Sequence, residues 1–157
     1  MLDNIPDNEM RAIVTGSSGY IGKQLFTEAQ NHFDSYGTQS SITVREGSLL
    51  PLRLDAPNQF DFDLIHQSDV VFLTAAISAP DVCAHDRDRS WATNVTGTCS
   101  FIESVIERGA HVMFFSSDTV YGERNERFEE DAECHPAGEY AEMKHEVEKR
   151  FIGNLLF

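Results

Sequence analysis

A tyrosine and a lysine near the end of the sequence have the spacing of a proton-transfer pair. Tyr140 and Lys144 are four residues apart, which places both side chains on one face of a helix predicted over residues 139–153. An ammonium group close to a phenol favours the phenolate and lowers the phenol pKa from about 10. The pair is therefore a candidate proton carrier near neutral pH, although this spacing also occurs in incidental surface pairs.

A glycine-rich turn near the start of the chain has the pattern of a dinucleotide site. The segment Thr-Gly-Ser-Ser-Gly-Tyr-Ile-Gly at 15–22 follows an apolar run and opens an amphipathic helix. Gly16 permits a tight turn, and Gly19 lets the backbone approach a pyrophosphate at the start of the helix. Gly22 lets the helix lie close to the preceding strand. The alternative is a glycine-rich turn that binds nothing.

Both groups need a scaffold in which strands and helices alternate. Such alternation predicts right-handed crossovers, a parallel sheet and an α/β, doubly wound fold with the strand order 3-2-1-4-5. The strands are expected at 11–15, 41–44, 50–54, 70–73 and 111–115. The helices are expected at 20–33, 61–67, 86–108 and 139–153. The longest of these helices has one apolar stripe, formed by Trp91, Val95, Thr98, Ile102 and Val105.

Polar clusters follow several of the predicted strands. They are Asp55, the segment 74–76, the segment 116–118 and the glycine turn at 16–21. In a doubly wound sheet the carboxyl ends of the strands lie at one edge, where ligands bind. The clusters are therefore expected to converge on one site, although Asp55 could instead cap the helix that follows it.

The choice between NAD and NADP is expected to depend on the end of the second strand. An acidic residue there would bond the ribose 2′-hydroxyl of NAD, and an arginine would accept the 2′-phosphate of NADP. Arg45 and Glu46 stand next to each other just after the run 41–44, so both interpretations remain open. NAD is slightly favoured.

Size and charge exclude several classes of protein. The chain has 157 residues and a net charge of −14, which should repel nucleic acid and anionic membranes. No apolar run approaches the length of a membrane span. Residues 1–10 have the composition of a polar leader and not of a secretory signal, and residues 11–157 form one expected domain. We expect a cytoplasmic protein.

The cysteines do not form a recognisable metal-binding pattern. Cys83, Cys99 and Cys134 are odd in number and include no Cys-x-x-Cys pair, which fits a reducing compartment. Cys134-His135 and Cys83-x-His85 are potential ligand pairs, but each lacks a second pair at zinc spacing. No metal site is therefore expected.

Six segments in order resemble the extended short-chain dehydrogenases/reductases, the NAD-dependent epimerase/dehydratase family. The segments are TGSSGYIG at 15–22, LDA at 54–56, TAA at 74–76, NVTGT at 94–98, FFSSDTVYG at 114–122 and YAEMK at 140–144. Their order and spacing agree with the family from residue 11 to about residue 153. The resemblance implies a Rossmann-type fold that binds NAD or NADP.

The resemblance also implies a role for individual residues. Tyr140 would be the acid/base, Lys144 its activator, and Ser117 would hold the reacting oxygen; these three are the expected catalytic residues. Asn94 would lie beneath the cofactor, and Asp55 would contact the adenine. The cofactor-binding residues are expected to be Gly16, Gly19, Tyr20, Ile21, Gly22, Arg45, Asp55, Ala56, Ala75, Ala76, Asn94, Tyr140 and Lys144.

The implied reaction is hydride transfer at a hydroxyl or carbonyl of a nucleotide sugar. The dehydratases of the family carry Thr-Asp-Glu where this sequence has Ser117-Asp118-Thr119, so dehydration is less expected here than epimerisation or reduction. Family members continue into a C-terminal substrate domain, which is missing from this sequence. The alternatives are a catalytically idle NAD(P)-binding or regulatory module, or a truncated product.

The last predicted strand is expected to form an exposed sheet edge. The run 111–115 is apolar and contains no proline or lysine that would protect an edge. The sequence then ends with further apolar side chains, at Phe151, Ile152, Leu155, Leu156 and Phe157. We expect self-association, or a partner that covers this edge, unless the tail folds back over it.

Overall fold

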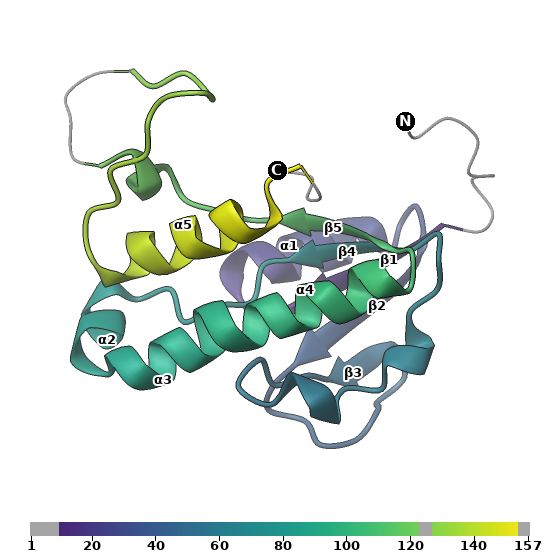
Figure 1. Ribbon diagram of the computed structural model, residues 1–157. Helices are drawn as coiled ribbons and strands as arrows, with labels where there is room; N and C mark the ends of the chain where they lie inside the picture. The colour runs from purple at the N-terminus through teal and green to yellow at the C-terminus, as the bar shows by residue number, and fades with distance from the viewer. Residues whose placement is uncertain (1–9, 123–126, 154–157) are drawn as a thin grey trace.

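The computed structural model describes residues 10–122 and 127–153 (Figure 1). Nearly all of the predicted polar leader, and the apolar residues Leu155, Leu156 and Phe157, lie outside these ranges. Within the described ranges no helix is both long enough and apolar enough to cross a bilayer.

Five parallel strands form one sheet with the order β3-β2-β1-β4-β5, which confirms the predicted fold. The strands are β1 (Arg11–Thr15), β2 (Asp34–Gln39), β3 (Leu49–Pro51), β4 (Val70–Leu73) and β5 (His111–Phe114). The chain reverses its direction of progress across the sheet between β1 and β4. Loops at the carboxyl ends of these two strands therefore diverge and leave room for a ligand.

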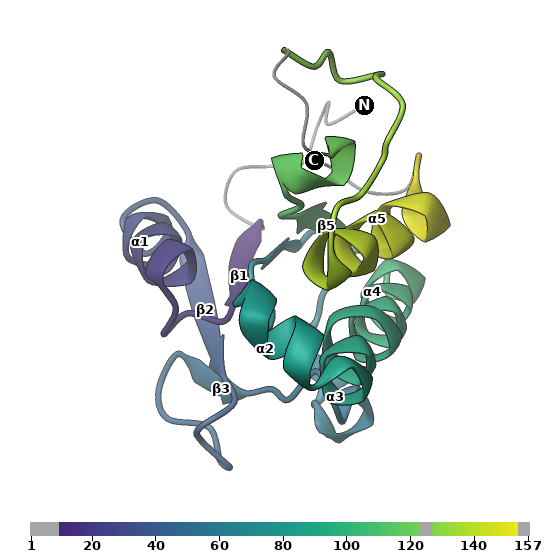
Figure 2. The same ribbon diagram turned by 90° about the vertical axis from the view of Figure 1, so that its left-hand side faces the viewer.

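Helices cover both faces of the sheet. They are α1 (Tyr20–Ala29), α2 (Pro80–His85), α3 (Arg87–Trp91), α4 (Thr98–Glu107) and α5 (Glu139–Phe151), with a π-helical segment (Ala92–Gly97) that joins α3 to α4. Short 3-10 turns lie at Pro57–Gln59, Phe62–Leu64 and Asp118–Tyr121. Figure 2 shows α1 beside β1 and β2 on one side, and α4 and α5 on the other.

The core lies between the central strands and the long helical region that ends in α4. Ile13 of β1 and Val71 of β4 are at most 1% exposed, as expected for strands covered on both faces. The predicted stripe is confirmed, because Val95, Ile102 and Val105 of the helical region pack into the same core. Gly109 ends the helix in a left-handed conformation, with φ of +79°.

The second strand was predicted in the wrong place. The β-branched run at 41–44 is a loop, and β2 is formed instead by the polar residues Asp34–Gln39. β2 packs against the glycine turn, where space is short: a Cβ on Gly37 would lie 2.6 Å from Ser17 Oγ. Small side chains are therefore required in β2, at residues that were not predicted to form a strand. The first helix ends at Ala29 and not near residue 33.

Candidate functional site

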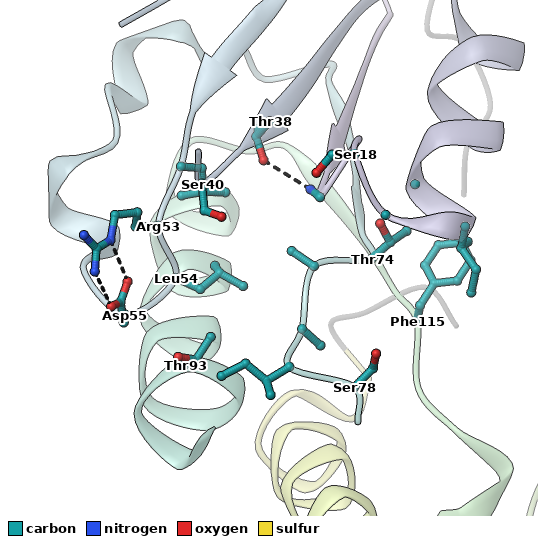
Figure 3. A pocket seen from close by; sticks show the side chains of 18 of the residues that line it. Ser18, Thr38, Ser40, Arg53, Leu54, Asp55, Thr74, Ser78, Thr93 and Phe115 are labelled. Carbon is teal, nitrogen blue, oxygen red and sulfur yellow. Dashed lines mark hydrogen bonds and ion pairs between the residues drawn. The ribbon is translucent and has the colours of Figure 1, made fainter. Parts of the chain in front are cut away.

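A cavity of about 650 Å³ lies at the carboxyl ends of the strands (Figure 3). Its volume is in the usual range for small-molecule sites. The glycine turn after β1, the ends of β2 and β3, the loop after β4, the end of β5 and the start of α5 all contribute to its lining. The predicted convergence of strand-end segments is thus what the structure shows.

The glycine turn is shaped by contacts that exclude larger side chains. Gly16 has a φ of +68°, and a Cβ there would lie 3.0 Å from Ala75 Cα. A Cβ on Gly22 would lie 2.3 Å from the Gly16 carbonyl oxygen. A Cβ on Gly19 would meet that same oxygen at 3.3 Å, with no further contact among the described residues. Gly16 and Gly22 are therefore required for the close packing of the turn itself. At Gly19 the absence of a side chain leaves space free beside the turn.

The start of α1 can receive an anion. Gly19 is the N-cap of α1, and it offers no side chain to bond the amide groups of the first turn. These N–H groups and the positive end of the helix dipole favour a phosphate or pyrophosphate. Tyr20 and Ile21 line the cavity beside them, with exposed fractions of 91% and 54%.

The loop after β4 is held by two sets of hydrogen bonds. The Thr15 hydroxyl accepts a bond from the Ala75 amide at 3.1 Å, and Thr74 donates to the Thr15 carbonyl. Asn94 accepts from the Ile77 amide and donates to the Ile77 carbonyl, each at 2.8 Å. Asn94 itself is 4% exposed and is not among the cavity-lining residues. It positions the loop that carries Ala75 and Ala76.

Asp55 lines the cavity in a bidentate ion pair with Arg53. Arg53 Nη2 lies 2.6 Å from Asp55 Oδ2, and Arg53 Nε lies 3.1 Å from Asp55 Oδ1. This guanidinium lowers the pKa of the Asp55 carboxyl. Asp55 does not cap the turn that follows, because Ala56 holds the N-cap position. Ala56 is not among the residues that line the cavity.

Tyr140 and Lys144 lie together at the cavity, but their protonation differs from the prediction. Lys144 is 4% exposed, and its Nζ donates to the Phe115 carbonyl at 2.6 Å and lies 5.7 Å from the Tyr140 ring centroid. Burial lowers the pKa of Lys144 to about 8. Burial also raises the pKa of Tyr140. The expected lowering of the phenol pKa is wrong here, because loss of solvation on burial, together with the nearby Cys83, raises it.

These features are accompanied by a match of residues 12–151 to the sequence profile of the NAD dependent epimerase/dehydratase family. The chain belongs to this family. Among curated relatives, methionine adenosyltransferase 2 subunit beta of Bos taurus is 27% identical over 157 residues. The dTDP-glucose 4,6-dehydratase of Mycolicibacterium smegmatis is 30% identical over 155 residues.

The structural neighbours include two proteins with bound NAD. MoeE5 in complex with UDP-glucuronic acid and NAD has a TM-score of 0.77 and 26% identity, over 88% of this chain and 47% of that protein. A short-chain dehydrogenase/reductase superfamily protein from Agrobacterium tumefaciens with bound NAD has a TM-score of 0.74 and 25% identity, over 90% and 43%.

The chain spans about half the length of the relatives that it matches. It covers 45% of the Bos taurus subunit with 98% of its own residues, and 46% of the Mycolicibacterium smegmatis dehydratase with 86%. The matched residues 12–151 include the glycine turn and the Tyr140–Lys144 pair.

Besides Ala56 and Asn94, two further predicted site residues, Arg45 and Ser117, lie outside the lining of the cavity. Arg45 donates to the Gly47 carbonyl in the loop beyond β2, because β2 ends at Gln39 and not at residue 44 as predicted. Ser117 bonds with the Thr119 hydroxyl at 2.8 Å and caps the turn at Asp118–Tyr121. Its neighbour Ser116 lines the cavity instead, and the Ser116 hydroxyl is buried without a hydrogen-bond partner among the described residues.

Several other residues that line the cavity were not predicted from the sequence. Thr38 and Ser40 line it at the end of β2, and they would have been found had that strand been placed correctly. Arg53, Arg89 and Thr93 line it as well. Arg53 stands two residues before Asp55, but nothing in the spacing alone indicated that the two side chains would pair.

Proposed function

We propose that this chain binds NAD or NADP and forms the cofactor-binding and proton-transferring part of an oxidoreductase that acts on a nucleotide sugar. The observation that carries the proposal is that one cavity contains the glycine turn, Asp55, the Ala75–Ala76 segment and the Tyr140–Lys144 pair. A cofactor cradle and a proton donor are thereby next to each other.

The residues present fit a dinucleotide along the length of the cavity. The uncapped start of α1 would hold the pyrophosphate, since a side chain at Gly19 would occupy the open side of the turn. Asp55 would accept a hydrogen bond from the adenine amine. Tyr140 and Lys144 would bond the ribose at the other end, where the Lys144 ammonium is held at the Phe115 carbonyl.

The proton chemistry belongs to this chain's own residues. When bound, the nicotinamide would supply or accept a hydride. The raised pKa of Tyr140 keeps its phenol protonated at neutral pH, so Tyr140 is poised to donate a proton to a substrate oxygen. Lys144, with a pKa of about 8, can replace that proton and stabilise the phenolate that remains. Ser116 or Ser117 would orient the substrate oxygen.

The nucleotide sugar is proposed from the relatives. The dTDP-glucose 4,6-dehydratase and the UDP-glucuronic acid complex both name a sugar linked to a nucleoside diphosphate. The sequence Ser117-Asp118-Thr119 lacks the second acid of the dehydratases, which favours epimerisation or reduction over loss of water.

Calorimetric titration with NAD⁺, NADH, NADP⁺ and NADPH tests cofactor binding. Gly19→Val should abolish the heat of binding, because its side chain would enter the cavity while the backbone at Gly19 needs no positive φ. Ser41→Val, at an exposed position outside the cavity, is the matched control. Absence of binding by the wild-type chain at millimolar nucleotide would refute the proposal.

Turnover of UDP- and dTDP-sugars, followed by cofactor absorbance or by product analysis, tests the enzymatic part. We expect slow turnover, since substrate positioning supplies several kcal/mol of barrier lowering and this chain spans about half of its relatives. Tyr140→Phe should remove nearly all of the activity and leave the cofactor affinity within about tenfold. An active Tyr140→Phe variant would rule out the proton-transfer role.

A second candidate is a binding module that holds NAD(P) without turnover. Two observations favour it: one relative is named as a subunit of an adenosyltransferase, and the Ser117 hydroxyl is engaged by Thr119 outside the cavity lining. The two candidates differ in one result. Binding that Gly19→Val abolishes, together with turnover absent from the wild type, would select the module.

A further inference from the structure

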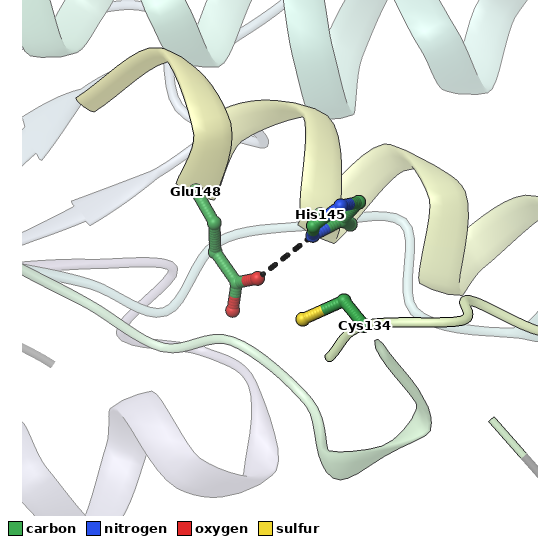
Figure 4. Close-up of side chains that lie close together, drawn as sticks. All are labelled: Cys134, His145 and Glu148. Atoms are coloured by element: carbon green, nitrogen blue, oxygen red, sulfur yellow. Dashed lines mark hydrogen bonds and ion pairs between the residues drawn. The ribbon is translucent and has the colours of Figure 1, made fainter. Parts of the chain in front are cut away.

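Three side chains with different metal-binding groups meet away from the cavity. Cys134 lies in the loop before α5, and His145 and Glu148 lie on α5 (Figure 4). Their ligand atoms all lie within 4.8 Å of one another, and His145 Nδ1 is 3.4 Å from Glu148 Oε2. All three residues are half-buried, and none lines the nucleotide cavity.

The spacing of these atoms is close to that of a tetrahedral zinc site. Zinc holds sulfur at about 2.3 Å and nitrogen or oxygen at about 2.0–2.2 Å, so neighbouring ligands stand about 3.4–3.6 Å apart. The distance from His145 to Glu148 already has this value. Figure 4 shows the Cys134 thiol directed toward the other two groups, and its sulfur lies within 4.8 Å of both of their ligand atoms.

We propose that Cys134, His145 and Glu148 bind one Zn²⁺ ion, with water as the fourth ligand. A thiolate, an imidazole and a carboxylate together suit zinc better than Mg²⁺ or Ca²⁺, which prefer oxygen ligands alone. Binding transfers no electrons. Cys134 Sγ, His145 Nδ1, one Glu148 carboxylate oxygen and the water oxygen each donate a lone pair to the ion, and the thiol proton leaves to solvent.

The proposed ion would tie the loop before α5 to that helix. The other part of the same loop is already anchored: the Phe128 ring stacks on Tyr121 at 5.1 Å, and Tyr121 donates to the Glu130 carbonyl at 3.3 Å. A bond to Cys134 would fix the remaining part. The ion thus acts as a structural clamp on the helix that carries Tyr140, and the site does not rest on the proposed nucleotide function.

The competing interpretation is an ion pair with a neighbouring thiol. His145 and Glu148 are three residues apart on one helix, where such pairs are common and weak. That interpretation predicts no preference for zinc and no dependence on Cys134.

Titration of the metal-free 157-residue protein with Zn²⁺ distinguishes the two. We expect one ion per chain, a rise in the midpoint of thermal unfolding, and a thiolate-to-metal charge-transfer band when Co²⁺ replaces Zn²⁺. Cys134→Ser, His145→Gln and Glu148→Gln should each weaken zinc binding by more than about tenfold. Cys134→Ser should also remove the cobalt band.

Two variants serve as matched controls. His135→Gln removes the histidine next to Cys134; the His135 ring pairs with Glu133 and not with the proposed site. Glu146→Gln removes a carboxylate of α5 that pairs with Lys149. Both should bind zinc like the wild type. The proposal is overturned if the wild type shows no cobalt band, if Cys134→Ser binds zinc normally, or if His135→Gln loses binding while His145→Gln retains it.

Discussion

The residues at the end of β2 are where a preference for NAD or NADP would be expected to arise. A carboxylate at that position would bond the ribose 2′-hydroxyl of NAD and repel the 2′-phosphate of NADP. The residues that line the cavity there, Thr38 and Ser40, are uncharged, and the nearby Asp55 is already paired with Arg53. We therefore expect the dissociation constants of NAD and NADP to agree within about tenfold.

Ser40→Asp should create the missing discrimination. The new carboxylate would weaken NADP binding by more than about tenfold, a loss of at least ~1.4 kcal/mol, and leave NAD binding unchanged or stronger. Calorimetric titration with both nucleotides measures the ratio. Ser41→Asp, one residue farther and outside the cavity lining, is the control and should leave the ratio unchanged. Equal losses for both nucleotides in Ser40→Asp would show that this residue does not face the ribose.

Lys144 should reduce stability at neutral pH because its charge is buried. Its pKa is about 8 in the folded chain and 10.5 for a fully solvated lysine, so the unfolded chain binds more protons between these values. The contribution of Lys144 to the free energy of unfolding therefore rises as the pH increases from 8 to 10.5, and it is lowest below pH 8. The cost at pH 7 is at most about 3 kcal/mol, part of which the bond to the Phe115 carbonyl offsets.

Lys144→Met should raise the free energy of unfolding at pH 7 by about 1–3 kcal/mol. The gain should shrink toward zero near pH 10.5, where the wild-type amine is neutral when folded. Denaturant unfolding at both pH values measures it. Lys149→Met, at an exposed position paired with Glu146, should change neither value by more than about 0.5 kcal/mol. A gain in Lys144→Met that is the same at both pH values would contradict the assigned cause.

At the scale of elements, one buried ion pair joins the N-terminal ends of the central strands β1 and β4. Arg11 at the start of β1 lies 2.6 Å from Asp69, which is 0% exposed and also accepts a bond from the His66 amide. Arg11→Met would leave the Asp69 carboxylate buried without its charge partner. We expect a loss of about 3–5 kcal/mol in the free energy of unfolding, measured by denaturant titration.

A double variant separates the ion pair from the packing. Arg11→Met combined with Asp69→Asn should recover part of that loss, because a neutral amide is less costly to bury than an unpaired carboxylate. If the double variant is no more stable than Arg11→Met alone, loss of packing by the long arginine stem explains the effect instead.

The elements with a strong periodic pattern could be predicted from the sequence. β1, β4 and the helical region ending in α4 are apolar where they meet the core, so their patterns carry the information. β2 could not be predicted, because Ser35, Gly37 and Thr38 are buried there to make room for the glycine turn. Its composition reflects a close contact between distant segments, which local patterning does not contain.

The candidate site divides in the same way. One group of cavity-lining residues could be predicted, because local turn and helix geometry sets the spacing of its members. This group contains Gly16, Gly19, Asp55 and the Tyr140–Lys144 pair. Two other features of the site could not be predicted from the sequence: the serine that faces the cavity and the pKa of Tyr140. Which of Ser116 and Ser117 faces the cavity depends on the backbone rotation after β5, and the effect of Lys144 on Tyr140 depends on burial.

At the scale of the whole molecule, the two edges of the sheet are unequal. β3 is three residues long and ends in Pro51, which lacks an amide for pairing, so that edge is protected. β5 is the other edge, and its residues His111–Phe114 contain neither proline nor lysine. Close to it, α5 ends at Phe151 and is followed by Ile152, which is 79% exposed.

We therefore expect the 157-residue chain to self-associate through the β5 edge. The net charge of −14 opposes association, so the associated fraction should grow with salt as repulsion is screened. Sedimentation velocity across the micromolar range, at low and high salt, measures it. His111→Lys places a charge on the edge and should shift the protein toward monomer, whereas Val44→Lys, in the exposed loop beyond β2, should not. A wild-type protein that stays monomeric at every concentration and salt would show that the β5 edge is not available for pairing.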